Sequence, residues 1–151
     1  MGSDVSARDI LEFLEVFSDK FKRCLRVTIE PLFEEDGLKL YHLIILAVIG
    51  RQEGMCQKEI TTHLPYDKSR VSMVVTELHA MGLVENVAKG KLRSLVLTDR
   101  GREINEVFKM AVSDFTDNLF SQFKGEEREA MIHNLGLLDE RLNGILAAHN
   151  H

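Results

Sequence analysis

The sequence lacks any long apolar run. Its longest uninterrupted apolar stretch, Leu43 to Ile49, has seven residues, whereas a helix that crosses a membrane needs about 20. The N-terminus also lacks the basic flank and the apolar stretch of a secretory signal. The sequence therefore predicts a protein that has no membrane segment and stays in the cytoplasm.

Cysteines are also few, and they are not paired along the chain. Cys24 and Cys56 lie far apart without Cys-x-x-Cys spacing, which argues against a disulfide scaffold and against a structural zinc site. The six histidines show no paired metal-ligand spacing, and no glycine-rich phosphate loop or pattern of nucleophile and base is present. We therefore expect two reduced thiols, no bound metal, no cofactor and no enzymatic activity.

An excess of basic residues is absent too, since the 151 residues include 19 Lys and Arg against 24 Asp and Glu, a net charge of −5. This balance weakens the case for a nucleic-acid partner, but the charge is unevenly distributed. Residues 57–100 contain seven bases and five acids, or +2, which leaves −7 for the rest of the chain. The segment that we expect to meet phosphates is therefore locally basic.

Two helices are predicted before the basic segment. From Ser6 to about Ile29, apolar residues recur at steps of three and four, which places one apolar stripe along a long helix that Pro31 ends. A second helix is predicted from Leu38 to Ile49, between Gly37 and Gly50. Because this segment is apolar nearly all round, we expect a central buried helix.

A helix-turn-helix motif is predicted next. Its first helix, from Met55 to Leu64, turns Ile60 and Leu64 inward and leaves Gln57 facing outward. Pro65 cannot extend this helix, and Asp67 is a good N-cap for the following one.

The second helix of the motif has two contrasting faces and ends at Gly82, a C-cap. Its predicted buried stripe is Val71, Val74, Val75, Leu78 and Met81. Its other face carries Ser69, Arg70, Ser72, Met73 and Thr76. Small hydroxyls with one arginine near a helix N-terminus suit a helix that reads the major groove, because a bulky or acidic tip could not approach the base edges. The alternative is the solvated face of an ordinary helix.

A β-hairpin is predicted after the motif. Strands at residues 83–87 and 93–97 flank a loop at residues 88–92, in which Gly90 supplies hairpin geometry. The tip carries three cations, Lys89, Lys91 and Arg93. Such a wing would grip the DNA backbone or enter the minor groove. The alternative is an edge hairpin that its lysines keep soluble.

Two more helices complete the chain. Thr98 is predicted to cap a helix that starts at Asp99, with Gly101 permitting close packing of its first turn. This helix runs to Phe123, Gly125 breaks it, and a last apolar stripe follows. That stripe consists of Met131, Leu135, Leu138, Leu142 and Ile145. These two helices and the first one have more apolar surface than a small core can cover, so we expect the surplus to be buried in a second subunit.

The predicted fold is mainly α with a small β-wing. It is a winged helix-turn-helix flanked by N- and C-terminal dimerisation helices. The expected domains are an N-terminal dimerisation helix at 1–36, a winged helix-turn-helix DNA-binding domain at 37–100, and C-terminal dimerisation helices at 101–151.

Three pieces of sequence, in this order and spacing, carry a family resemblance. They are Gln57-Lys58-Glu59-Ile60, Asp67-Lys68-Ser69-Arg70-Val71-Ser72, and Gly82-Leu83-Val84 followed by Leu97-Thr98-Asp99-Arg100-Gly101. With them the chain resembles the MarR family of bacterial and archaeal transcription regulators. The resemblance implies a homodimer that binds a near-palindromic operator in double-stranded DNA. It also implies that small phenolic or aromatic ligands often weaken DNA binding.

By position, the resemblance implies base-reading roles for Ser69, Arg70, Ser72 and Met73, and makes Arg93 the wing arginine. The remaining expected DNA-binding residues are Gln57, Lys68, Thr76, Lys89 and Lys91. The chain departs from the family pattern in its shorter wing loop, in Asn86 where an arginine is common, and in Met73 where a basic residue is frequent. These departures bear on how deeply the wing enters DNA.

An effector pocket is expected where the dimerisation helices meet the motif, because a ligand there can change the spacing between recognition helices. The candidate lining residues are Phe17, Phe21, Tyr41 and His42. The alternative is that these are ordinary core side chains.

Three functional hypotheses follow. The first is a ligand-responsive, dimeric, sequence-specific transcription regulator, which we expect to be a repressor. The second is a thiol-based redox-sensing regulator that uses Cys56 or Cys24, the latter having basic neighbours such as Arg23 that lower a thiol pKa. The third is a winged-helix module whose basic wing binds an acidic protein.

Overall fold

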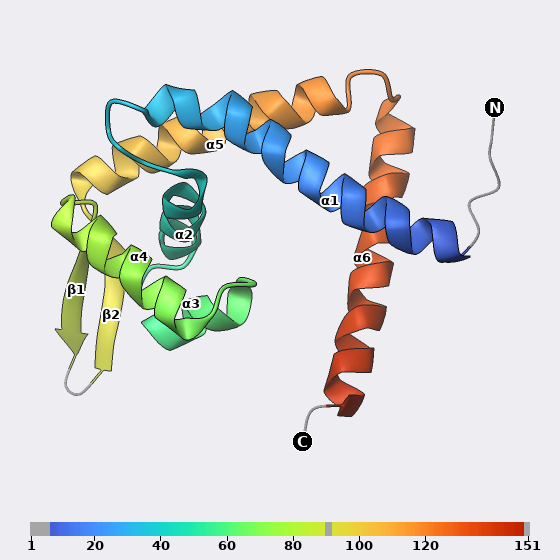
Figure 1. The fold of residues 1–151 in the computed structure, drawn as a ribbon. Coiled ribbons are helices and arrows are strands. Elements are labelled where there is room, and N and C mark those ends of the chain that lie inside the picture. Colours follow the sequence, from blue (N-terminus) through green and yellow to red (C-terminus); the bar gives the residue numbers. More distant parts are fainter. Residues whose placement is uncertain (1–6, 90–91, 150–151) are drawn as a thin grey trace. The chain divides into compact units, whose positions relative to one another are not determined.

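The computed structural model of the chain describes residues 7–89 and 92–149 (Figure 1). Helices dominate it, and the strands that it describes form one two-stranded antiparallel sheet. The predicted fold class, mainly α with a small β-wing, is confirmed. The chain divides into two compact units, Met1–Ser113 and Asp114–His151. No helix within the described ranges is long and apolar enough to cross a membrane.

The first unit begins with α1 (Ala7–Ile29), followed by the 3-10 helix η1 (Glu30–Phe33). Pro31 lies in the first turn of η1. Proline restricts the residue before it and cannot donate a helical hydrogen bond, so the α-helix ends just ahead of it, as predicted. The Glu30 carboxylate then accepts a 2.7 Å hydrogen bond from the backbone N–H of Leu40, the first residue of the next helix.

The central buried helix, α2, runs from Leu40 to Arg51. Its predicted boundary at Gly50 is wrong, because Gly50 lies inside the helix. A Cβ at this position would come within 2.6 Å of Nδ2 of Asn105 and 2.8 Å of Cδ1 of Leu97. Glycine is present here because other elements pack closely against α2, and a glycine in a helix interior is tolerated where packing requires it.

The helix-turn-helix consists of α3 (Gln57–His63) and α4 (Lys68–Ala80), which pack against each other and against α2. The first helix was predicted to include Met55, and this is wrong. The carbonyl of Met55 accepts a 2.9 Å hydrogen bond from the N–H of Leu95, so Met55 pairs with the wing. Backbone groups used in a sheet are not available to a helix, and α3 therefore starts later.

The wing is the antiparallel pair of β1 (Val84–Lys89) and β2 (Leu92–Leu97). The register pairs Val84 with Leu97 at the base and Lys89 with Leu92 near the tip. Both strands extend further toward the tip than predicted, so only residues 90 and 91 lie between them.

One core holds the first unit together. It is built from the apolar sides of α2 and α4, the base of the wing and the start of α5. The predicted buried stripe of α4 is confirmed for Val71, Val74, Val75 and Leu78. It is wrong for Met81, which is 40% exposed. The helix ends there, because Gly82 follows at φ 74°, and the chain turns so that Leu83 fills the core instead.

Two long helices follow the wing, α5 (Asp99–Leu119) and α6 (Gly125–His149). The prediction that Gly125 breaks α5 is wrong. Gly125 is the first residue of α6, and α5 has already ended at Leu119. The Glu127 carboxylate accepts the N–H of Lys124 at 3.0 Å, which satisfies a donor at the start of α6.

Candidate nucleic-acid interface

The start of α4 is fixed by Asp67. This residue has extended backbone angles, and its Oδ1 accepts a 2.8 Å hydrogen bond from the N–H of Arg70. A side-chain oxygen that accepts from the third helical N–H is the geometry of an N-cap. The predicted cap is therefore confirmed, and it determines which residues of α4 stand at its exposed tip.

The outward face of α4 carries the predicted DNA-binding side chains. All of them are exposed: Lys68, Ser69, Arg70, Ser72, Met73 and Thr76. The hydroxyl of Thr76 donates to the carbonyl of Ser72 at 2.9 Å, which leaves its oxygen lone pairs available. Because the buried residues of α4 occupy the opposite face, this surface has the composition and exposure that base-edge contacts require.

Gln57 is the first residue of α3 and is half-buried, and its carbonyl accepts a 3.1 Å bond from the hydroxyl of Thr61. In the wing, Lys89 pairs with Leu92 and Arg93 pairs with Ala88, so both predicted cations belong to the strand ends nearest the tip. Lys91, the third predicted wing cation, lies outside the described residues.

Arg70 contacts two tyrosine rings. Its Cζ is 5.3 Å from the ring centroid of Tyr41 on α2 and 5.0 Å from that of Tyr66 in the turn before α4. Both distances are in the range of cation–π contacts. Sequence reasoning placed Tyr41 with a ligand and missed Tyr66. Tyr66 could have been noted as an aromatic residue four positions before an arginine at a helix start.

His42 joins α2 to α4. It is 3% exposed, its Nδ1 accepts the N–H of Lys39 at 3.0 Å, and its Nε2 lies 3.2 Å from Oε2 of Glu77. Because Nδ1 accepts, the neutral ring carries its proton on Nε2 and donates it to Glu77. Both ring nitrogens of His42 thus have partners within the chain.

The four candidate ligand residues fall into two groups. Phe17 and Phe21 stack on each other along α1 with ring centroids 6.5 Å apart, and Phe17 stacks on Phe13 at 5.5 Å. Tyr41 and His42 contact each other at the start of α2, with ring centroids 4.4 Å apart.

A separate surface cleft of about 370 Å³ lies where α1, η1 and the loop before α2 meet. Its lining residues are Arg26, Val27, Glu30, Pro31, Glu34, Gly37, Leu38 and Lys39. Sequence reasoning missed this cleft.

The two cysteines occupy different surroundings. Cys24 is exposed on α1, and its neighbour Arg23 forms a 2.9 Å ion pair with Asp19. Cys56 is partly buried, and its thiol donates to Oε1 of Glu59 at 3.3 Å. Among the residues that the structure describes, no three His, Cys, Asp or Glu side chains gather as a metal site.

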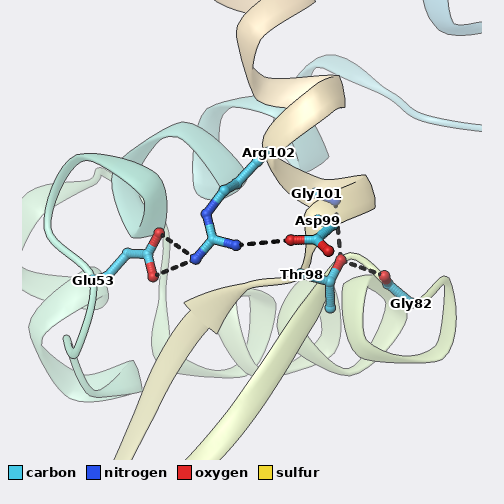
Figure 2. A network of polar contacts seen from close by, with 6 residues as sticks. All are labelled: Glu53, Gly82, Thr98, Asp99, Gly101 and Arg102. Atoms are coloured by element: carbon cyan, nitrogen blue, oxygen red, sulfur yellow. Dashed lines mark hydrogen bonds and ion pairs between the residues drawn. The ribbon is translucent and has the colours of Figure 1, made fainter.

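A polar network fixes α5 to the base of the wing (Figure 2). The hydroxyl of Thr98 accepts the N–H of Gly101 at 3.0 Å and donates to the carbonyl of Gly82 at 2.6 Å. Arg102 binds Glu53 at 3.2 Å and Asp99 at 3.3 Å. Figure 2 shows these residues meeting from the loop after α2, the turn before β1 and the junction of β2 with α5. The predicted cap at Thr98 is confirmed.

Arg100 ties α5 to the loop before α2, through ion pairs of 3.2 Å to Glu103 on α5 and 2.7 Å to Asp36 in that loop. The hydrogen bond that Arg100 donates to Glu103 and the negative charge of Asp36 raise the pKa of Arg100 above its usual value. The guanidinium therefore stays charged at every working pH.

Sequence comparison identifies the winged segment. Residues 36–91 match the MarR family. No curated protein matches the chain.

Solved structures share the fold over most of the chain. A MarR transcriptional regulator from Methanosarcina mazei Go1 is 22% identical, with a TM-score of 0.80 over 89% of this chain and 99% of that one. The MepR–DNA complex of S. aureus is 19% identical, with a TM-score of 0.72 over 93% and 99%. Staphylococcus aureus MarR in complex with salicylate and kanamycin is 18% identical, with a TM-score of 0.77 over 91% and 95%.

These solved structures are those of transcriptional regulators, and the expectation that the chain is not an enzyme stays a prediction. Residues 36–91 match the MarR family, and the chain has the fold of MarR transcriptional regulators of known structure.

Proposed function

We propose that this chain is a homodimeric transcription regulator of the cytoplasm that binds a near-palindromic site in double-stranded DNA through α4 and the wing. The observation that carries the proposal is the exposed face of α4, which combines small hydroxyls with Arg70 behind a fixed N-cap. Its support from relatives is that MepR, which shares the fold, is known in complex with DNA. We assign residues 37–100 to DNA binding.

The negative charge of the chain does not oppose this role, because two acids of the basic segment that lie next to or on α4 already have hydrogen-bond partners within the chain. Glu77 is bonded to the buried His42, and Asp67 is used in capping. The bases Lys68 and Arg70 stay exposed beside them. Phosphate contacts depend on such local charge more than on the net charge of the chain.

A mobility-shift assay with genomic fragments at low salt tests DNA binding. Arg70→Ala is expected to weaken binding by about 1–3 kcal/mol and to relax sequence preference, as for an arginine that reads a base. The matched control, Lys109→Ala, removes the same charge from α5 outside the proposed surface and is expected to bind like wild type. The proposal is refuted if the wild-type chain gives no mobility shift at low salt, or if the Arg70→Ala variant binds DNA as tightly as wild type. A stable protein complex in place of DNA binding would favour the protein-interaction module instead.

Dimerisation is supported by the apolar side chains that α1 and α6 leave exposed. On α1 these are Ile10, Leu11, Phe13, Leu14, Val16, Phe17 and Phe21. On α6 they are Ile132, Leu135, Leu137, Leu138, Leu142, Ile145 and Leu146. Contiguous apolar surface of this kind marks an interface rather than a solvated face. We therefore assign residues 1–36 and 101–151 to the contact with a second copy.

Sedimentation measurements at micromolar concentration test this contact. Leu14→Glu and Leu138→Glu each place a charge in an apolar face and are expected to shift the dimer toward monomer. Glu12→Gln, on the polar side of α1, is expected to remain dimeric. A wild-type chain that sediments as a monomer contradicts the assignment.

We further propose that the regulator is a repressor released by a small aromatic ligand. The relative in complex with salicylate supports this choice. Phe17, Phe21, Tyr41 and His42 are the proposed contacts. Titration of the protein–DNA complex with salicylate tests the proposal, and DNA binding unaffected by saturating aromatic acids would overturn it.

A further inference from the structure

Both tyrosines of this chain contact the same arginine. Tyr41 extends from α2 and Tyr66 from the turn between α3 and α4, and their ring centroids lie 5.3 and 5.0 Å from Cζ of Arg70. We call these three residues the arginine clamp. Two elements far apart in sequence thus meet at one side chain of the recognition helix.

The two rings are anchored, whereas the arginine is not buried. Tyr41 and Tyr66 are partly buried and pack against the core of the first unit. The ring of Tyr41 also contacts His42, whose two nitrogens are bonded to Lys39 and Glu77. Arg70 itself is exposed. The rings therefore form a fixed support for a side chain that faces solvent.

The N–H groups of the Arg70 guanidinium have no protein acceptor within the described ranges, since the bond of Arg70 to Asp67 uses its backbone N–H. A guanidinium stacks through its faces and donates hydrogen bonds in its plane. Cation–π contacts therefore hold the group without using its donors. The donors remain available to a phosphate or a guanine edge.

We propose that Tyr41 and Tyr66 are positioning residues that hold the guanidinium of Arg70 ready for DNA. This inference rests on the proposed function. An unsupported arginine loses much rotamer freedom when it binds, and a clamped one has lost part of that freedom beforehand. The clamp therefore raises affinity without adding charge to the surface.

The opposite role would be restraint, in which Arg70 must leave the rings before it reaches DNA. The two roles predict opposite changes in DNA affinity when the rings are removed. If the rings position Arg70, their removal weakens DNA binding. If they restrain it, their removal strengthens binding.

The test uses a DNA duplex that the full-length wild-type chain has selected from a random pool. Tyr66→Leu keeps apolar packing but removes the aromatic face, and we expect it to weaken binding about two- to fivefold, the range of one exposed cation–π contact. Tyr66→Phe keeps the face and is expected to restore binding. The salt dependence should not change, because neither variant alters a charge.

Double variants distinguish positioning from general damage. In an Arg70→Ala background, Tyr66→Leu is expected to have no further effect, because the side chain on which it acts is gone. Tyr41→Leu should behave in the same way. Nuclear magnetic resonance of the free protein provides a direct readout. The Arg70 side-chain protons should show upfield ring-current shifts in wild type and Tyr66→Phe, reduced in Tyr66→Leu.

Each outcome decides the question. Weakened binding by Tyr66→Leu that disappears in the Arg70→Ala background supports the clamp. Unchanged or tighter binding by Tyr66→Leu, or an effect that adds to that of Arg70→Ala, overturns the clamp while the proposed function stands. A wild-type chain that selects no duplex overturns the proposed function and the clamp with it.

Discussion

Gly101, in the first turn of α5, lies directly against the backbone carbonyl of Leu83. A Cβ at position 101 would overlap the Leu83 oxygen, which also accepts the N–H of Thr98 at 3.0 Å. The obstacle is backbone, which cannot rotate away as a side chain can. This contact sets how closely the start of α5 approaches the base of the wing.

Gly101→Ala should therefore destabilise the protein by about 1–3 kcal/mol, as overpacking against a rigid neighbour does. Urea unfolding at one fixed protein concentration measures the change. Gly125→Ala is the matched control, because nothing lies within 4 Å of a Cβ there. The control should be neutral or slightly stabilising. An equal free energy of unfolding for the two variants would show that Gly101 is not tightly packed against Leu83.

Thr98→Val should remove the cap of α5 while keeping the shape of the side chain. The N–H of Gly101 and the carbonyl of Gly82 each lose a partner. We expect a loss of about 1 kcal/mol in the free energy of unfolding, typical of a lost N-cap. Thr98→Ser retains the hydroxyl and should stay within a few tenths of a kcal/mol of wild type. A Val variant as stable as the Ser variant would argue against the cap.

The bond between His42 and Glu77 yields a third prediction. His42→Leu leaves the N–H of Lys39 and the carboxylate of Glu77 without their partner. Because Lys39 and Glu77 are partly exposed and water can replace the lost partner, we expect a cost of about 0.5–1.5 kcal/mol in stability, the net contribution of a typical hydrogen bond. Glu77→Gln still offers an oxygen to Nε2 of His42 and should cost less. Thermal unfolding of both variants shows which is less stable. A Glu77→Gln variant less stable than His42→Leu would contradict this prediction.

The features predicted correctly from the sequence are those that depend on neighbours along the chain. The cap at Asp67 and the buried spacing of Val71, Val74 and Leu78 follow from helical geometry alone. The close packing at Gly101 was also predictable, because a glycine beside a capping threonine marks a crowded helix start.

The features missed depend on elements distant in sequence. Gly50 looked like a helix boundary, because the packing of Asn105 against α2 is invisible in the sequence. Met55 looked helical, because its pairing with Leu95 forms across the wing. The contact of Tyr66 with Arg70 was missed, as was the contact that Tyr41, on another helix, makes with the same arginine.

Lys91 provides a prediction about the wing. If it contacts a phosphate, Lys91→Ala should weaken binding almost equally for all DNA sequences. It should also reduce the slope of log K against log salt by about 1 for each wing that contacts DNA. Lys109→Ala, with the same loss of charge on α5, should leave the slope unchanged. A slope that both variants reduce equally would indicate a diffuse charge effect in place of a wing contact.

Selection of bound duplexes from a random DNA pool tests the central claim most directly, because it reports binding, sequence preference and symmetry together. A dimer that places two copies of α4 in the major groove should recover a near-palindrome. Its half-sites should be about 34–36 Å apart, which is one helical turn or 10–10.5 base pairs. Enrichment of no sequence, or of single half-sites without a partner at fixed spacing, would contradict the claim.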